Sequence, residues 1–408
     1  MAETVNQRPD FEDTSIAFAY KSDKDLKKAH FLFKLMNSSF LVNIGTSLTP
    51  MVMRWGVPVN GLIRNTIFRQ FVGGESMEET GAVAELLAKY GVNVILDYGV
   101  EGKSDEESFD KATEVFLKVI KYASSNEHIP FMSIKLTGIA RFGLLEKLDA
   151  AAKEKLGYTG LLHTGILTEQ EREELKRVKY RLDRIVQFAA ESGVGVLVDA
   201  EESWIQDPMD ALVAEMMEKY NKAKAIVYNT FQLYRSDRLE FLKASHKEAR
   251  EKGYILGAKI VRGAYMEKER ERALEKGYPS PIQPDKPACD KDYNEAVDYC
   301  IRNHKDISVI IASHNQDSNL LGTEIIDSLG IPHNHPHINF SQLYGMSDHI
   351  TFNLARKGYN VSKYLPFGPI KDVIPYLMRR AEENSSVSGQ TGRELSLIRK
   401  EMQRRGLL

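Results

Sequence analysis

The sequence lacks the features that mark exported, disulfide-bonded and nucleic-acid-binding proteins. Its 408 residues include only two cysteines, Cys289 and Cys300, which fits reduced thiols better than a disulfide framework. Lys and Arg number 55 against 57 Asp and Glu, so no basic surplus favours a nucleic-acid partner. The start of the chain, MAETVNQRPDFEDTS, follows neither the pattern of a secretory signal nor that of a transit peptide. We therefore expect a cytoplasmic protein that binds no nucleic acid.

No apolar run is long enough to cross a membrane. The most apolar region, 31–55, falls short of the roughly 20 uninterrupted residues that a spanning helix needs. It is interrupted by Lys34, Asn37, Asn43, Pro50 and Arg54. We expect an amphipathic helical segment that packs on the main domain, with peripheral contact at the inner face of a membrane as the alternative.

Two phosphate-binding signatures are also missing. No expected strand is followed by Gly-x-Gly-x-x-Gly, so a dinucleotide-binding Rossmann unit has no support. Neither Gly-x-x-x-x-Gly-Lys nor a kinase-like set of motifs is present, so phosphoryl transfer is not expected.

What the sequence does contain is a repeated pattern of short apolar runs and amphipathic segments. Residues 1–90 have apolar residues at helical spacing, and runs rich in branched residues begin near Gly91. Eight such runs, each followed by a helix-sized segment, predict an α/β fold of the (β/α)8 type, with a doubly wound open sheet as the alternative. We expect an N-terminal helical region at 1–90, the barrel at 91–386 and a helical tail at 387–408. The eight runs are VNVILDYG, PFMSIKLTG, VGVLVDAEE, AIVYNTFQLY, YILGAKIVRGAY, SVIIASHN, HINFSQLYG and NVSKYLPFG.

Two segments depart from the simple alternation. Residues 142–192 are long enough for two helices, and Thr168 and Glu171 are spaced as a capping box. The segment 279–290 contains four prolines, and we expect it to form an extended loop after the fifth strand.

Polar side chains occur near the end of each apolar run. In a parallel barrel these ends meet on one face, where the chemistry of such barrels lies. Burying polar groups without partners costs about 1–3 kcal/mol each, so their number predicts a shared polar cavity. The alternatives are an interior lysine paired with Asp97 or Asp199 for Lys135, and a satisfied core histidine for His314. The polar residues are Asp97, Glu101, Lys135, Asp199, Glu201, Glu202, Asn229, Gln232, Lys259, Arg262, Tyr265, Ser313, His314, Asn315, Gln342, Tyr344 and Tyr364.

The stretch 359–386 combines a strand, a Pro-Phe-Gly-Pro turn and a helix with a polar face. Its helix carries Tyr376, Arg379, Arg380 and Glu383 at spacings of three and four residues. Two neighbouring guanidinium groups suit a ligand carboxylate, and the alternative is a solvated face on which Glu383 pairs with Arg379.

Further positive side chains indicate that a second anionic group binds here, in addition to the carboxylate. Lys135, Lys259 and Arg262 exceed what one small carboxylate needs, and the Arg-Gly-Ala turn in VRGAY lets the backbone approach a phosphate. We therefore predict a phosphate-bearing cofactor. His333, His335 and His337 in HNHPH are a weak alternative as metal ligands, since this loop precedes its strand. No metal site is expected.

Several of these blocks together resemble the proline dehydrogenase family, in its stand-alone, eukaryotic-type branch. They are also similar to the proline dehydrogenase domain of bifunctional proline utilisation proteins. The likeness runs from about Val94 to Ser386. It rests on GAKIVRGAYMEKER, IIASHNQDS, FSQLYGMSD and KYLPFGPIKDVIPYLMRRAEENSS. The resemblance implies a (β/α)8 flavoenzyme that oxidises L-proline to 1-pyrroline-5-carboxylate by hydride transfer to FAD and passes electrons to a membrane quinone.

The resemblance also implies roles for individual residues. Arg379 and Arg380 would clamp the substrate carboxylate beside Lys135, while Tyr364 and Tyr376 wall the substrate ring. Asp199 would be the acidic partner in that site, and Glu101 would form an ion pair with the last helix to close a lid. Lys259 stands where some members have arginine, which weakens the expectation of a contact near the flavin N5. The FAD-contacting positions would be Asn229, Lys259, Arg262, Gly263, Ala264, Tyr265, His314, Asn315 and Glu383.

Tyr364 bears on the choice of substrate. Family branches that look specific for hydroxyproline tend to lack this tyrosine, so we expect L-proline as substrate. A hydroxyproline dehydrogenase of the same family is the main alternative, and a metal-dependent barrel hydrolase or a regulatory DNA-binding protein fits less well. We also expect a separate pyrroline-5-carboxylate dehydrogenase to take up the product.

Overall fold

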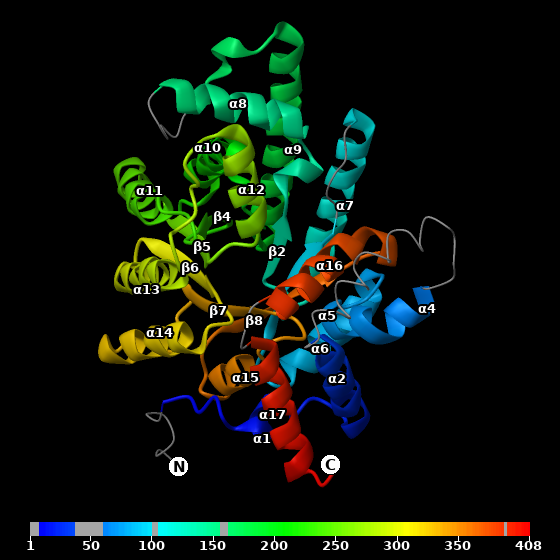
Figure 1. Ribbon diagram of the computed structural model, residues 1–408. Helices are drawn as coiled ribbons and strands as arrows, with labels where there is room; N and C mark the ends of the chain where they lie inside the picture. Colours follow the sequence, from blue (N-terminus) through cyan, green and yellow to red (C-terminus); the bar gives the residue numbers. More distant parts are fainter. Residues whose placement is uncertain (1–7, 37–59, 100–104, 156–161, 387–389) are drawn as a thin grey trace. The chain divides into compact units, whose positions relative to one another are not determined.

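Eight parallel strands form a closed barrel. The computed structural model describes residues 8–36, 60–99, 105–155, 162–386 and 390–408 (Figure 1). The strands follow one another around the barrel in chain order, so the (β/α)8 prediction is confirmed and the open sheet is wrong. Each predicted run corresponds to one strand, and only β6 begins outside its run, one residue earlier. The strands are β1 Asn93–Tyr98, β2 Phe131–Ile134, β3 Gly195–Val198, β4 Val227–Gln232, β5 Leu256–Val261, β6 Ile307–Ala312, β7 Ile338–Leu343 and β8 Val361–Phe367.

Helices occupy most of the remaining described residues. Between β2 and β3 the chain forms the two expected helices, α8 and α9. The capping box at the start of α9 is present, since Glu171 N donates to Thr168 Oγ1 and Thr168 N donates to Glu171 Oε2. The α-helices are α1 Thr14–Ala17, α2 Asp23–Met36, α4 Asn60–Ile63, α5 Arg69–Phe71, α6 Met77–Ala88, α7 Glu106–Ser124, α8 Phe142–Lys155, α9 Glu169–Ser192, α10 Ser203–Tyr220, α11 Arg238–Lys252, α12 Met266–Lys276, α13 Lys286–Arg302, α14 Gln316–Ser328, α15 Asp348–Arg356, α16 Ile370–Ser386 and α17 Gln390–Arg404. A π-helix, η1 Arg64–Phe68, and two 3-10 turns, η2 Leu136–Gly138 and η3 Thr164–Ile166, complete the set.

Only the first part of the segment 279–290 is outside a helix. Helix α13 already begins at Lys286 and is capped by Asp285, whose side chain accepts a hydrogen bond of 2.8 Å from Ala288 N. Pro287 lies in the first turn, where a missing N–H removes no helical hydrogen bond. The predicted loop is therefore wrong for 286–290, because Pro287 lies in the first turn of a helix.

The described residues divide into two compact units. One is formed by Met1–Gly99 with Ser341–Leu408, and the other by Val100–Phe340. The second unit contains β2 to β6 and α7 to α14, while the first contains β1, β8 and the helices at both ends of the chain. The domain boundaries expected near residues 90 and 386 stay a prediction.

Two strands of the second unit, β3 and β4, are buried along their whole length. All four residues of β3 and all six of β4 are buried, as expected for parallel strands covered on both faces. Both cysteines are free thiols buried in α13. Burial raises the pKa of the Cys289 thiol to about 11, so this thiol is protonated at neutral pH.

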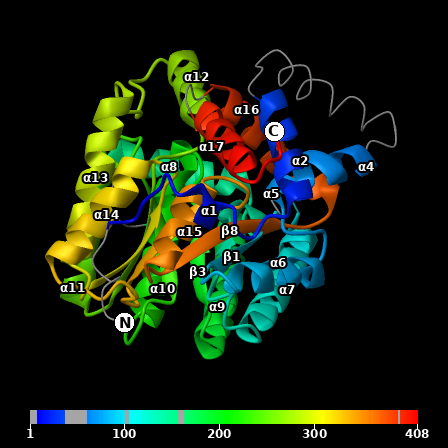
Figure 2. The same cartoon turned by 90° about the horizontal axis from the view of Figure 1, so that it is seen from below.

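The first unit has an apolar core shared by helices from both ends of the chain. Leu26 and Phe33 of α2 belong to the same buried cluster as Leu377 of α16 and Ile398 of α17. Figures 1 and 2 both show α2 beside α17. The part of the expected amphipathic segment beyond Met36 lies outside the described residues. No helix in the described ranges is long and apolar enough to cross a bilayer.

A buried charged cluster lies in the first unit, around the start of α15. Lys363 of β8 is fully buried, and its Nζ lies 3.0 Å from Asp348 Oδ1. The Tyr20 hydroxyl donates to Asp348 Oδ2 at 2.8 Å. Glu394 of α17 accepts a hydrogen bond of 2.7 Å from the backbone N of Ser347, a residue in the left-handed region with φ of 51°. This contact ties α17 to a strained turn.

The Glu394 carboxyl predicts a pH-dependent stability. Burial raises the pKa of Glu394 to about 7, above its usual 4.5. The protonated Glu394 carboxyl therefore contributes most to the free energy of unfolding in acid, and this contribution is lost as the pH rises through about 7. We expect Glu394→Gln, which keeps the oxygen that accepts from Ser347, to raise the free energy of unfolding by about 1–3 kcal/mol near pH 8 and little near pH 5.

Denaturant unfolding of the two proteins at both pH values measures this difference. Glu401→Gln on the same helix is the matched control. Burial raises the pKa of Glu401, but hydrogen bonds from Arg404 and Arg405 bring it below its usual value. Glu401→Gln, which removes this carboxylate, should therefore destabilise the protein near pH 8. A Glu394→Gln protein that is no more stable than the wild type near pH 8 would refute the raised pKa of Glu394.

Candidate active site

Two adjacent strands of the second unit bring Lys135 and Asp199 together at their carboxyl ends. Ile134 of β2 pairs with Val198 of β3, and Asp199 N donates to Ile134 O at 2.9 Å. Lys259 lies in β5, where it pairs in register with Thr230 of β4. Because all these strands run in parallel, the three charged side chains occupy the same end of the sheet.

The Asp199 carboxylate lies between the two lysines. Lys259 Nζ donates to Asp199 Oδ1, and Lys135 Nζ lies 3.6 Å from Asp199 Oδ2. The side chains of Lys135 and Asp199 are 12% and 14% exposed, and that of Lys259 is 7% exposed. Lys135 thus has Asp199 as a charged partner, as the alternative of a paired interior lysine expected. With two lysines and one carboxylate, these three side chains carry a net positive charge and have limited access to solvent. Such a cluster can bind an anionic ligand.

The Arg262 guanidinium is anchored on all of its nitrogens. Its Nε donates to Asp290 at 2.8 Å, and its two terminal nitrogens donate to Ser313 and Ser318 at 2.8 and 2.9 Å. The group also lies 4.2 Å from the centroid of the Tyr293 ring. Arg262 is therefore a fixed positive charge beside the first turn of α14.

The turn after Arg262 needs a glycine. Gly263 has a φ of 141°, and a Cβ atom at this position would lie 2.4 Å from the Tyr234 ring. The neighbouring Ala264 is exposed, and Tyr265 is half-buried at the start of α12. This arrangement leaves backbone of the turn open to a ligand.

Two other predicted positions in the second unit, Asn229 and Asn315, also have structural roles. The Asn229 side chain is buried and donates to Asp210 Oδ1 at 2.9 Å. Asn315 caps α14, since its side chain accepts from Ser318 N at 2.9 Å. His314 is half-buried in the segment between β6 and α14.

The histidine loop before β7 has its own partners. His333 Nε2 lies 2.7 Å from Asp327 Oδ1, and His337 Nδ1 lies 2.7 Å from the His304 carbonyl oxygen. Within the described ranges no group of three potential ligands lies close enough to hold a metal ion.

In the first unit, α16 carries the arginine pair. Its buried face, which includes Val373 and Leu377, belongs to the apolar core, and Asp372 lies in its first turn. Arg380 is buried with its guanidinium carbon 5.4 Å from the Tyr376 ring centroid. Arg379 is half-buried. The solvated-face alternative therefore fails for Arg380.

Tyr364, Glu383 and Glu101 complete the predicted site. Tyr364 is half-buried in β8, where it pairs with Ile95 of β1. Glu383 belongs to α16, but its side chain lies outside the described residues, as does the whole of Glu101.

The residues that hold the predicted ones in place were not themselves predicted. Asp290 and Ser318 fix Arg262 but lie on helices, away from any strand end. Thr137 bonds Glu201 from the turn after β2 and was hidden in an ordinary apolar run. The polar side chain within that run was the only available signal.

Comparison with known proteins identifies the family. A family model described as proline dehydrogenase matches residues 81–393. "Proline dehydrogenase 1, mitochondrial" from Dictyostelium discoideum is 34% identical over 96% of this chain and 74% of its own length. A hydroxyproline dehydrogenase from Xenopus laevis is 29% identical over 97% of this chain and 90% of its own.

A solved structure supports the fold. The chain superposes on a proline utilization A (PutA) from Bdellovibrio bacteriovorus with a TM-score of 0.70, at 22% identity, over 91% of this chain. It spans 38% of that PutA chain. With the match to the family model, these similarities show that the chain belongs to the proline dehydrogenase family.

Proposed function

We propose that this protein oxidises L-proline to 1-pyrroline-5-carboxylate, with FAD as hydride acceptor and a membrane quinone as the final electron acceptor. The observation that carries the proposal is the cluster of Lys135, Asp199 and Lys259 at the strand ends, within a chain whose residues 81–393 match the proline dehydrogenase family. The family supplies the reaction class, and the cluster supplies positive charge at the barrel face where such reactions occur.

The donor set of the second unit fits a flavin nucleotide. Gln232 is buried at the end of β4, and among the described residues its Oε1 has no hydrogen-bond partner, which suits a ligand N–H. Arg262 and the open turn at Gly263 suit a pyrophosphate. When bound, FAD would accept the hydride. We propose Asn229, Lys259, Arg262, Gly263, Ala264, Tyr265, His314, Asn315 and Glu383 as its contacts.

The proposed substrate contacts are divided by chemistry. Arg379 and Arg380 bind the carboxylate of proline, because a guanidinium offers paired donors in a fixed plane. Tyr364 and Tyr376 would pack against the ring, and Lys135 with Asp199 would complete the polar surroundings. Glu101 is proposed as an ion-pair partner that closes the site.

The positive charges also act on the substrate amine. A secondary amine must be uncharged to lose a hydride, and neighbouring cations lower the pKa of an ammonium group. Lys135, Lys259 and the arginine pair would therefore help proline shed its proton, and no dedicated general base is needed.

Hydroxyproline is a second candidate substrate. The relative from Xenopus laevis is named for it, at 29% identity over 97% of this chain. We favour proline because the bulky Tyr364 ring would leave little room for a ring hydroxyl.

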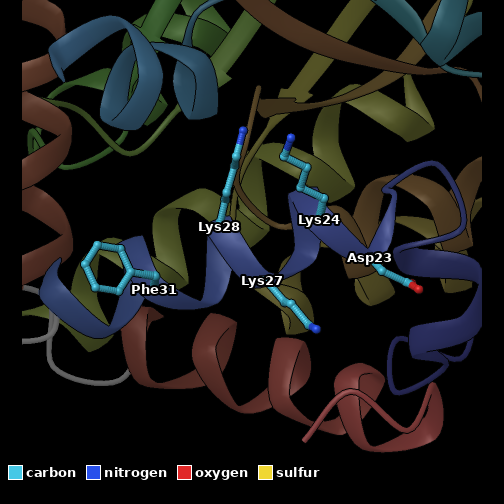
Figure 3. Close-up of a pocket in the computed structure, with 5 residues that line it drawn as sticks. All are labelled: Asp23, Lys24, Lys27, Lys28 and Phe31. Atoms are coloured by element: carbon cyan, nitrogen blue, oxygen red, sulfur yellow. The ribbon is translucent and has the colours of Figure 1, made fainter. Parts of the chain in front are cut away.

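The exposed face of α2 suits contact with a membrane surface. Phe31 is 60% exposed and Leu35 38% exposed, and both lie on one stripe of the helix with Lys24, Lys27, Lys28 and Lys34. Figure 3 shows four members of this stripe around a surface pocket. Lysines beside exposed apolar side chains are typical of helices that bind anionic lipid. Peripheral binding would bring the protein to a quinone.

Cellular placement follows from the same proposal. We propose a cytoplasmic protein at the inner face of a membrane, whose product is taken up by a separate pyrroline-5-carboxylate dehydrogenase. Several relatives carry mitochondrial names. A mitochondrial location, with the quinone of that membrane as electron acceptor, would support the same reaction.

Oxidation of L-proline tests the function directly. We expect protein supplied with FAD and a soluble quinone to form 1-pyrroline-5-carboxylate, trapped as its coloured adduct with o-aminobenzaldehyde. Arg380→Lys should raise KM for proline about 10–100-fold, because lysine cannot form the paired hydrogen bonds. Arg302→Lys, at an exposed ion pair on α13, is the control and should leave KM unchanged. Failure of the wild type to form product would refute the proposal.

Tyr364→Ser tests the choice of substrate. Removal of the ring should raise the ratio of kcat/KM for hydroxyproline over that for proline by about tenfold or more, because space opens for the hydroxyl. Tyr364→Phe keeps the ring and should leave the ratio near the wild-type value. An unchanged ratio in Tyr364→Ser would count against a steric role for this residue.

Vesicle flotation tests the α2 face. We expect binding to vesicles with phosphatidylglycerol and little binding to phosphatidylcholine alone. The double variant Lys27→Glu, Lys28→Glu should lose about tenfold or more in affinity, since each lysine near an anionic surface contributes about 1 kcal/mol. Phe31→Ser should also weaken binding, whereas Leu274→Ser, at an exposed apolar residue on α12, is its control and should have no effect. Equal binding by wild type and double variant would exclude this face.

A further inference from the structure

A buried carboxylate holds the turn that follows Lys135. Glu201, on the loop after β3, is 4% exposed. Its Oε2 accepts a hydrogen bond of 2.6 Å from the Thr137 hydroxyl, and its Oε1 accepts one of 3.2 Å from Thr137 N. Thr137 lies in the 3-10 turn η2, which begins immediately after Lys135. Both oxygens of one carboxylate therefore bind one residue of this turn.

Glu201 is itself fixed from two other elements. Its backbone N donates to Gln206 Oε1 of α10 at 2.9 Å, and its carbonyl accepts from Gln232 Nε2 of β4 at 3.1 Å. Gln206 in turn donates to Asp210 at 2.8 Å, which bonds the buried Arg238. The position of Glu201 is thus set by hydrogen bonds to α10 and β4 as well as by those to Thr137.

Lys135 is consequently held both through its side chain and through the turn that follows it. Its ammonium lies 3.6 Å from Asp199, and the turn directly after it is bonded to Glu201, two residues beyond Asp199. A lysine side chain has several rotatable bonds, and an ordered one loses up to about 2 kcal/mol of conformational entropy. Fixing the backbone beside it limits where its ammonium can lie.

We propose that Glu201 is a positioning residue that, through Thr137, fixes Lys135 beside Asp199. Its part in turnover rests on the proposed oxidation of proline, whereas the placement of Lys135 can be measured without any substrate. In this role the Glu201 carboxylate acts on Lys135 through the turn and makes no contact with the substrate itself.

Glu201 should also respond to pH. Burial raises its pKa to about 7, while the hydrogen bonds from Thr137 and the charge of Lys135 lower it and Glu202 raises it. The charged groups around it are Lys135 after β2, Asp199 and Glu202 on its own loop, Asp210 on α10 and Lys268 on α12, which pairs with Glu202. As the pH rises through about 7, Glu201 ionises and its bonds to Thr137 become charge-assisted. The hold on the turn tightens in the same range.

Chemical labelling of Lys135 tests the inference independently of turnover. Holoenzyme is treated with a trace of acetic anhydride, and acetylation of Lys135 is measured by peptide mass spectrometry against the exposed Lys176. We expect Thr137→Val and Glu201→Ala each to raise the labelling rate of Lys135 about fivefold, because one or both hydrogen bonds that hold the turn are lost. The double variant should label no faster than Glu201→Ala. Glu240→Gln, at an exposed carboxyl on α11, is the control and should label as wild type.

Proline kinetics supply the second readout. Thr137→Val should raise KM about tenfold with kcat changed less than about threefold, since the loss is in positioning. Glu201→Gln keeps an acceptor and a donor for Thr137, so its KM should stay near the wild-type value below about pH 6. The ratio of its KM to that of the wild type should then rise through about pH 7.

The outcomes separate the two proposals. Unchanged labelling of Lys135 in both Thr137→Val and Glu201→Ala would overturn the positioning role, whatever the kinetics show. Should Glu201→Ala fail to fold, unchanged labelling in the conservative Thr137→Val would overturn it alone. If the two variants label faster at Lys135 but the wild type does not oxidise proline, the positioning role stands and the proposed function is refuted.

Discussion

The site depends on one carboxylate that two lysines share. Asp199 lies between Lys135 and Lys259. The three residues come from the ends of three different strands of the barrel. Each charge is largely removed from water, so taking away one partner would leave another buried charge uncompensated at a cost of several kcal/mol. The cluster is therefore a structural requirement as well as a source of positive potential. A barrel of parallel strands is what brings such distant residues to one face.

Much of this arrangement could be predicted from the sequence. The eight apolar runs correspond to the eight strands, because strands buried on both faces read as continuous apolar runs. The capping box at Thr168 was legible because it depends on local spacing alone. Lys135, Asp199 and Lys259 were found as charged residues closing apolar runs. The segment 279–290 was misread, because proline marks the first turn of a helix as well as a loop.

The remaining features depend on tertiary contacts that leave no local pattern. The partners of Arg262 come from α13, from the end of β6 and from α14, and only the folded chain shows that its guanidinium is anchored. Asn229 and Asn315 illustrate the opposite difficulty. Both read as site residues, and both also satisfy buried backbone or side-chain groups. Lys363 and Asp348 likewise form a buried pair in the first unit that composition could not reveal.

The account's central claim is that the cluster around Asp199 serves a flavin-linked oxidation of proline. Anaerobic mixing of the FAD-loaded protein with L-proline, followed by the visible absorbance of the flavin, tests it most directly when the wild type is compared with Lys259→Met. The account predicts that L-proline bleaches the wild type and that Lys259→Met retains its flavin but is bleached at least about a hundredfold more slowly, as expected for loss of a group that stabilises charge at the reacting centre. A wild-type spectrum that L-proline leaves unchanged, or a variant bleached at the wild-type rate, would contradict it.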